Sequence, residues 1–281
     1  MPKECTHWIM ANRLIDRIPP SNPVASLLAE HRSFVLVGAI LPDTLLHAVI
    51  GPNHGNAHAA ASRFHSPGRH SYQTLQAILE STSPTPQELA LLIGVATHIE
   101  TDIVFHPCIE MLAGGSISEH YRLETLLDQW ICQAYRQKPA SLSSLLNQQI
   151  MDTVATLLPL LQPSAPAVTK QQAKIYLQLH ALIQKSYDHP LGRGMAAVLS
   201  RCMPALHRYK NLWYPSETPQ HWPWPANCAG CSEVTCLLPD TCILQVEKRL
   251  DRLMTAIQEK GIKEAFIDQP GEDLITGQRP Q

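Results

Sequence analysis

The stretch GVATHIETDIVFHP places two histidines and a carboxylate four residues apart, at His98, Asp102 and His106. Four residues advance a helix by about 40° beyond one full revolution, so His98 and Asp102 project from the same face. Leu91 shares that face, and a charged group among apolar side chains is costly unless it is paired or bound to a metal. The spacing therefore predicts a metal site on the buried face of a helix.

The next stretch, GGSISEHYRLETLLDQWI, repeats the pattern with His120 and Glu124. Ser116 and Glu119 have the spacing of a capping box at a helix start, and Leu127 shares the face of the two ligand candidates. A single inward histidine is more often a hydrogen-bonded core residue, but two successive helices with an inward imidazole and carboxylate favour a metal. These ligand types suit Zn²⁺ better than Fe or Mn.

His106 does not share one ion with His98. It is rotated by about 80° from His98 and lies about 12 Å further along the helix axis. Pro107 disfavours the helical conformation of the residue before it, so we expect the helix to end at His106. That imidazole would then face a second metal position.

The elements that must position these residues are predicted to be helices. A 3.6-residue period dominates, and only SFVLVGAI at 33–40 has strand character, which a buried helix segment would share. The last residues, DQPGEDLITGQRPQ, are polar and contain Gly and Pro, so we expect them to be frayed. The expected fold class is all-α, with helices near 5–16, 23–31, 71–82, 87–105, 118–136, 141–160, 169–186, 192–209 and 244–260.

Composition argues against several functions. A net charge of −2 and a pI near 6.7 give no indication of a surface for duplex nucleic acid. The N-terminus lacks an apolar signal region, and no stretch approaches the roughly 20 apolar residues of a membrane span. Cys5, Cys108, Cys132 and Cys202 are scattered, which is typical of free thiols in a reducing compartment. We therefore expect a cytoplasmic protein whose oligomeric state the sequence leaves open.

In their order, these motifs resemble the zinc-dependent phospholipase C family, which is related in fold to the zinc-dependent single-strand nucleases. The family's order is an N-terminal His, a Pro-Asp, a loop His, His-x-x-x-Asp, a further His and His-x-x-x-Glu. The matches are THW, GAILPD, SRFHSPGRH, HIETDIVFHP and EHYRLE, over about residues 5–130. We divide the chain into an all-α phospholipase C-like domain at 1–212 and a Trp/Pro- and Cys-rich segment with a helix and a tail at 213–281.

The resemblance implies two or three zinc ions held by three groups of residues. Asp102 would bridge two ions, which accounts for a carboxylate with two oxygens at that position. His65 is favoured as the loop ligand because SRFHSPG most resembles the family's segment, with His70 next. The implied ligands are Asp43, His65 and His98 for one ion, Asp102 and His7 for a second, and His106, His120 and Glu124 for a third.

The sequence departs from the family at two points. Secreted members use the backbone amine of a processed N-terminal Trp as a ligand, whereas Trp8 is internal here, so the cluster could hold only two ions. The gap between Asp102 and His106 is shorter than in the secreted enzymes, so the local turn must differ. His54 and His58 lie amid Gly, Asn and Ala, and are either solvated loop residues or residues that face the substrate.

The function that the resemblance implies is hydrolysis of a phosphoester, either a small molecule or a phospholipid headgroup. Paired zinc ions about 3.5–4 Å apart lower the pKa of a bridging water and clamp an in-line displacement at phosphorus. Asp43 would accept the proton of that water. The alternatives are a nuclease or nucleotidase on the same cluster, and a non-catalytic helical protein with a structural metal. Solvent access over Asp43 and Asp102 would favour catalysis, and closed coordination would favour the structural role.

The sequence leaves alternatives for the role of two features near the C-terminus. The stretch CAGCSEVTCLLPDTC partly matches a zinc ribbon, with an iron–sulfur cluster or free thiols as the alternatives. The tryptophans of NLWYPSETPQHWPWP either make transient contact with a membrane surface or pack over the domain. The residues concerned are Cys228, Cys231, Cys236 and Cys242, and Trp213, Trp222 and Trp224.

Overall fold

The computed structural model describes residues 3–48, 57, 61, 65, 68–136, 141–161, 168–187, 189–202, 211–214 and 239–280. Every regular element within these ranges is a helix, which confirms the all-α class, and the run at 33–40 falls largely in a helix. The elements are α1 (Glu4–Arg17), α2 (Ala25–Glu30), α3 (Arg32–Gly38), α4 (Leu41–Thr44), the 3-10 helix η1 (Leu45–His47), α6 (Gln73–Ser81), α7 (Pro86–Ala113), α8 (Ile117–Ala134), α9 (Leu142–Leu145), α10 (Gln148–Leu157), α11 (Lys170–Ser186), α12 (Pro190–Cys202), α13 (Pro239–Lys260) and α14 (Ile262–Ile267).

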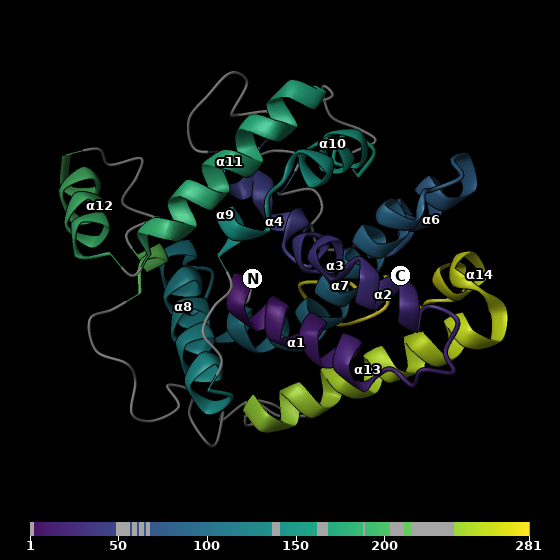
Figure 1. Ribbon diagram of the computed structural model, residues 1–281. Coiled ribbons are helices and arrows are strands. Elements are labelled where there is room, and N and C mark those ends of the chain that lie inside the picture. The colour runs from purple at the N-terminus through teal and green to yellow at the C-terminus, as the bar shows by residue number, and fades with distance from the viewer. Residues whose placement is uncertain are drawn as a thin grey trace.

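Helix α7 is the central element, with α1, α3, α8 and α13 packed around it (Figure 1). Thr85 and Glu88 form a capping box at its start, Pro86 occupies its first turn, and Gly114 ends it with a φ of 57°. Each of these signals is local, so the sequence sets both ends of the helix before tertiary packing contributes.

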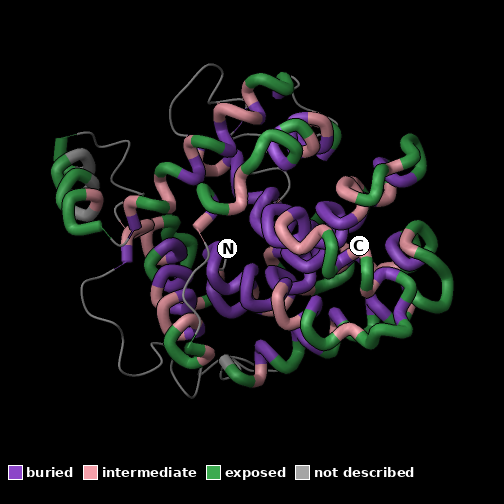
Figure 2. Tube along the Cα trace, viewed as in Figure 1, coloured by how far each residue is buried: buried purple, intermediate pink, exposed green. Residues whose placement is uncertain are grey.

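Helix α7 is buried on all sides along most of its length. The purple middle of Figure 2 shows this burial for α7 together with α1 and α3. The polar residues Thr97, Glu100 and Thr101 of this helix belong to a second buried layer. There Glu100 accepts a hydrogen bond of 2.6 Å from the Tyr72 hydroxyl and pairs with Arg249 of α13. By length and composition α7 could cross a membrane, contrary to the expectation for this chain, but 89% of its most apolar window is buried inside the protein. That burial is the pattern of a core helix.

Helices α3 and α7 meet backbone to backbone. A Cβ atom on Gly94 would lie 2.2 Å from the Val35 carbonyl oxygen, and one on Gly38 would lie 2.1 Å from a backbone oxygen of α7. Only glycine permits such an approach. The contact places Ala39, directly after α3, beside His98, whose Nδ1 lies 2.9 Å from the Ala39 carbonyl oxygen.

Contrary to expectation, α7 does not end at His106 but continues through Pro107 to Ala113. Proline removes the donor that would bond the Ile103 carbonyl, which normally weakens or kinks a helix. Here Gly277 packs against both residues of the missing hydrogen bond. A Cβ on it would be 3.0 Å from the Ile103 oxygen and 3.1 Å from the Pro107 ring. Tertiary packing therefore holds this turn of α7 in place despite the lost hydrogen bond.

The C-terminal segment is folded up to residue 280, not frayed as expected. The Asp273 carboxylate accepts hydrogen bonds from the backbone N–H groups of Ile275 at 2.7 Å and Thr276 at 2.9 Å, which builds a turn. Leu274 within it is 3% exposed. This turn follows α13 and α14, and α13 packs along α1 and α7 (Figure 1). The division of the chain at residue 212 stays a prediction.

Other expected helices differ in extent. The segment 141–160 forms two helices, α9 and α10, because Asn147 interrupts it and caps α10 by accepting from the Ile150 N–H at 2.9 Å. The helix expected at 192–209 is α12, and 203–210 lies outside the described residues. The short helices α4, η1 and α14 were not predicted because fewer than two turns carry no readable period.

Cys5 of α1 and Cys132 of α8 form a disulfide, so the expectation of free thiols is wrong for this pair. The helices bring together two cysteines that lie 127 residues apart in the sequence. Cys202 is a free thiol, as expected, and Cys108 is not part of this disulfide. Disulfides persist chiefly in oxidising compartments. The cytoplasmic location stays a prediction, and the presence or absence of this disulfide in protein isolated from cells tests it.

Candidate metal centre

The predicted ligands come from α1, α4, α7, α8 and the segment before α6. The structure brings all of them together in three adjoining groups, in each of which the ligand atoms lie within 4.8 Å of one another. Their role as ligands remains a prediction. The groups are His7, His98 and Asp102; Asp43, His65 and His98; and His106, His120 and Glu124.

Asp102 lies at the centre of the three groups. Its Oδ1 is 3.4 Å from the Nε2 of His7, and its Oδ2 is 3.0 Å from the Nε2 of His98 and 3.8 Å from that of His106. Because α7 stays helical through Pro107, Asp102 faces one histidine a turn before it and another a turn after it. Oδ1 thus faces His7, whereas Oδ2 faces both His98 and His106 of the third group.

Asp43 completes the second group from the short helix α4. Its Oδ1 is 3.4 Å from the Nε2 of His65 and 3.6 Å from that of His98, and its Oδ2 is 4.0 Å from the Nε2 of His7. The side chains of Asp43 and His65 are each 9% exposed, whereas that of Asp102 is fully buried. Asp43 and His65 therefore lie on the solvent side of the centre.

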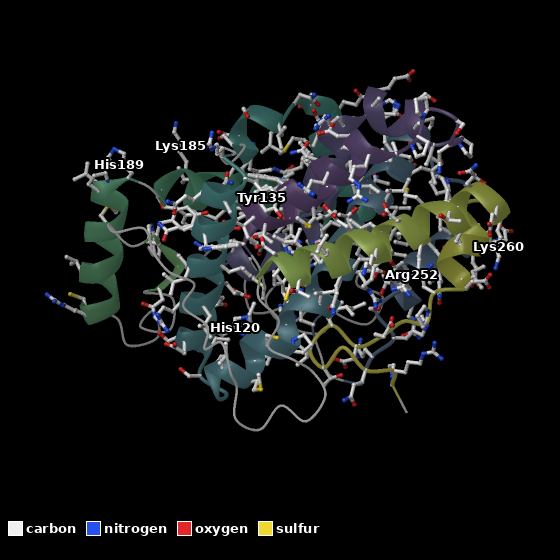
Figure 3. All side chains as sticks on the ribbon, turned by 90° about the horizontal axis from the view of Figure 1, so that it is seen from below. His120, Tyr135, Lys185, His189, Arg252 and Lys260 are labelled. Atoms are coloured by element: carbon white, nitrogen blue, oxygen red, sulfur yellow. A yellow bond between two sulfur atoms is a disulfide. The ribbon has the colours of Figure 1, made fainter. Side chains whose placement is uncertain are left out.

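The third group joins the ends of α7 and α8. The Nε2 of His120 lies 2.6 Å from Oε1 of Glu124, four residues later on α8, and the Nε2 of His106 lies 4.0 Å from the same oxygen. Ser116 caps α8 by accepting from the Glu119 N–H, which sets where this helix starts. His120, labelled in Figure 3, is 11% exposed in its side chain.

Four of the histidines are oriented by a hydrogen bond on the ring nitrogen that faces away from the centre. In metal sites such a bond fixes the tautomer and leaves the other nitrogen with a lone pair for the ion. Sequence reasoning missed these partners because three of them are backbone carbonyls. The pairs are His98 with the Ala39 carbonyl at 2.9 Å, His106 with the Leu274 carbonyl at 2.9 Å, His65 with the Ala61 carbonyl at 3.0 Å, and His120 with the Glu110 carboxylate at 2.9 Å.

The histidines of the centre differ in their pKa values and therefore in their charge. Burial and the charge of His98 lower the pKa of His7 to about 3, and burial lowers that of His120 to about 4. Burial also opposes a proton on His98, but the charges of Asp102 and Asp43 outweigh it and raise the pKa of His98 to about 9. Without a metal, His98 thus carries the positive charge that balances part of the buried carboxylate charge.

Several buried polar atoms of the centre have no hydrogen-bond partner. They are both oxygens of Asp102, Oδ1 of Asp43, Nε2 of His106 and both ring nitrogens of His7. Unsatisfied buried polar atoms are costly, so native proteins rarely retain them without a ligand. Cations between these atoms would satisfy them, and imidazole with carboxylate is the donor set that Zn²⁺ takes in catalytic sites. The residues therefore fit zinc.

Other candidates lie elsewhere. His70 packs against Gly271 and is in none of the three groups. Trp213 donates a hydrogen bond of 3.0 Å to the Ser186 hydroxyl and so packs over the domain. Cys242 is buried in α13, and burial raises the pKa of its thiol. Its place in a metal site with the other three cysteines stays a prediction. His54, His58, Cys228, Cys231, Cys236, Trp222 and Trp224 lie outside the described residues.

Comparison with known proteins agrees with this centre. Residues 6–159, more than half of the chain, match the family described as zinc dependent phospholipase C. The matched range contains every residue of the three groups. No curated protein and no solved structure matches the chain. The chain therefore belongs to the zinc-dependent phospholipase C family.

Proposed function

We propose that the protein hydrolyses a phosphodiester, with a phospholipid headgroup as the substrate class, on two or three zinc ions held by the three groups. The observation that carries the proposal is that Asp102 directs one oxygen to His7 and the other to His98, at 3.4 Å and 3.0 Å. A carboxylate in that position can bridge two ions. When bound, such a pair lowers the pKa of an attacking water and stabilises the charge that develops on the phosphoryl oxygens.

Asp43 is the residue we assign to proton transfer. During hydrolysis the water oxygen would form a bond to phosphorus, and Asp43 would accept the proton that the water loses. The bond from phosphorus to the leaving oxygen would break, and that oxygen would keep the electron pair and take a proton from solvent. A carboxylate on the solvent side can exchange that proton, and Asp43 is partly exposed. Buried Asp102 and His98 have no such access, and we assign them to holding the ions.

The slight exposure of the side chains of Asp43, His65 and His120, at 9%, 9% and 11%, supports catalysis over a purely structural metal. A structural site is closed by protein ligands, whereas a catalytic site keeps a position for water or substrate. From these exposures we infer that the fully buried Asp102 and His98 mark one side of the centre, and that Asp43, His65 and His120 mark the other. Water and a phosphoryl group would approach from the second side.

The experiment compares wild type with Asp102→Asn for zinc content, by plasma mass spectrometry, and for release of phosphocholine from phosphatidylcholine vesicles. We expect the variant to lose more than about one zinc per chain and to lose activity by roughly 10²-fold or more. The substitution keeps the shape of the side chain, so a loss reports on the carboxylate charge.

Asp128→Asn is the matched control, because Asp128 is also a buried aspartate but lies in none of the three groups. It accepts hydrogen bonds from the Thr6 N–H at 2.6 Å and the Tyr214 hydroxyl at 2.6 Å. It should keep full zinc content. A wild type that binds zinc yet cleaves only nucleotides or single-stranded nucleic acid would refute the phospholipid assignment and support the nuclease alternative.

A further inference from the structure

A second cluster of ligating side chains lies outside the three groups. Glu4 of α1, His47 of η1 and His180 of α11 bring their ligand atoms within 4.8 Å of one another. The side chains of Glu4 and His180 are 5% and 0% exposed, and that of His47 is 11% exposed. Glu4 and His180 lie outside the range 6–159 that matches the family.

Both imidazoles face the same carboxylate. The Nε2 of His180 is 2.8 Å from Oε1 of Glu4, and the Nε2 of His47 is 3.7 Å from it. The two rings are stacked, with centroids 3.9 Å apart and planes at 9°. The Tyr187 hydroxyl lies 2.9 Å from the Nε2 of His47 and 3.3 Å from Oε1 of Glu4. Four polar groups from separate parts of the chain thus surround one point.

The partners of the two Nδ1 atoms, which face away from Glu4, bear on which ring nitrogens carry a hydrogen. The Nδ1 of His47 lies 3.1 Å from the Asp43 carbonyl oxygen, which can only accept, so this Nδ1 carries the hydrogen. The Nδ1 of His180 lies 3.2 Å from the Thr44 hydroxyl, which can donate to it or accept from it, and its Nε2 is hydrogen-bonded to Oε1 of Glu4. In the neutral tautomer of His47 that follows, the Nε2 lone pair faces the Tyr187 hydroxyl and Glu4.

The Nε2 lone pair of His47 and the Glu4 carboxylate then compete for the single hydrogen of the Tyr187 hydroxyl, and a cation between them would satisfy both. The second oxygen of Glu4, Oε2, is buried and has no hydrogen-bond partner. The hydrogen bonds on Oε1 leave this atom without a partner in a side chain that is more than nine-tenths buried. An unpartnered oxygen at such a position points to a bound ligand. Two imidazoles and a carboxylate are a zinc donor set.

We propose that Glu4, His47 and His180 bind an additional divalent cation of the zinc type, separate from the ions of the three groups. The Tyr187 hydroxyl, 2.9 Å from the Nε2 of His47, would be a fourth polar group beside this ion. The inference goes beyond the proposed function, because it concerns a site that takes no part in phosphoester hydrolysis.

The position of this site explains what the ion would do. Glu4 precedes His7 by three residues on α1, and His47 follows Asp43 by four residues, with its Nδ1 on the Asp43 carbonyl. Each of these two segments therefore carries one residue of the new site and one of the catalytic centre. An ion held by His180 of α11 would fix α1 and α4 relative to each other, and with them His7 and Asp43.

The test is the zinc content of the full chain, by plasma mass spectrometry after exhaustive dialysis, in wild type, His180→Gln and Glu4→Gln. We expect each variant to lose about one zinc per chain relative to wild type. His189→Gln is the matched control, because His189 is an exposed histidine outside every ligand group (Figure 3). Should His180→Gln fail to fold, Glu4→Gln removes only a charge and keeps the packing.

The outcome is separable from that of the proposed function. Zinc lost from Asp102→Asn but retained by both His180→Gln and Glu4→Gln would overturn this inference and leave the proposed function intact. Zinc lost from these two variants but retained by Asp102→Asn would overturn the proposed function and leave this inference intact. As a second measurement, Co²⁺ added to metal-free protein should give a d–d absorption component that is absent in His180→Gln. Identical spectra in the two proteins would also overturn the inference.

Discussion

The Nδ1 of His106 hydrogen-bonds to the backbone carbonyl of Leu274, 168 residues later in the chain, at a distance of 2.9 Å. The same turn carries Gly277, which lies against the Pro107 ring and the Ile103 carbonyl. The C-terminal turn therefore supports the irregular part of α7 and also orients a predicted ligand. A segment outside the family match is thus part of the metal centre's surroundings.

Deletion of residues 270–281 should weaken zinc binding at the third group, because His106 would lose the partner that orients its ring. Loss of such an outer hydrogen bond typically costs about 10–100-fold in metal affinity. Competition with a chromophoric chelator measures the effect. Deletion of 279–281 alone leaves Leu274 and Gly277 in place and should bind zinc as wild type does. Equal affinity of both truncated chains would show that the turn does not support the site.

The two inward histidine–carboxylate pairs could be predicted from the sequence because each pair lies on one helix. Spacing by four residues on a helix fixes relative position whatever the tertiary structure. His98 with Asp102 and His120 with Glu124 are indeed close, at 3.0 Å and 2.6 Å. Fold class followed from the same period.

Contacts between distant segments could not be predicted. The rule that a residue before proline leaves the helix is a local preference, and packing by Gly277 outweighs it at Pro107. The cluster of Glu4, His47 and His180 joins three segments with no shared motif, so no spacing in the sequence indicates it. The Cys5–Cys132 pair was missed for the same reason.

Replacement of Gly94 by alanine should destabilise the protein and disturb His98. The added Cβ would lie 2.2 Å from the Val35 carbonyl oxygen, so α3 must move away from α7, at a cost of about 1–3 kcal/mol or more. That movement also displaces the Ala39 carbonyl from the His98 ring. Urea denaturation and zinc content of the same samples measure the two effects.

Gly194→Ala is the control for this substitution, since Gly194 is also in a helix but a Cβ there meets nothing within 4 Å. It should be neutral or stabilising by up to about 1 kcal/mol. If Gly94→Ala is as stable as Gly194→Ala, the backbone contact between α3 and α7 is looser than the structure indicates.

Reduction of the Cys5–Cys132 disulfide should lower stability. The bond closes a long loop between α1 and α8, and disulfides of this kind typically contribute about 2–4 kcal/mol. Melting in the presence and absence of dithiothreitol measures the change, and Cys5→Ser should melt like the reduced protein under both conditions. Complete alkylation of Cys5 in protein isolated from its own cells without reductant would contradict the bond and support the cytoplasmic location.

Zinc affinity should rise with pH. The charges of Asp102 and Asp43 outweigh burial and raise the pKa of His98 to about 9, whereas His7 and His120, with pKa values of about 3 and about 4, are already neutral. A zinc ion must therefore displace one proton from His98, so the logarithm of the affinity should increase by about one per pH unit between about pH 7 and 9 and then level off.

The metal-free protein should show the opposite trend. Because the folded pKa of His98 is raised above its ordinary value of 6.5, its contribution to stability is fully present below about pH 6.5 and is lost as the pH rises through about 9. Asp43→Asn removes one of the two charges that raise this pKa, so its affinity should level off at a lower pH. Chelator competition and urea denaturation at pH 7, 8 and 9 measure both trends. Zinc affinity that stays constant over this range would mean that His98 carries no proton for the metal to displace.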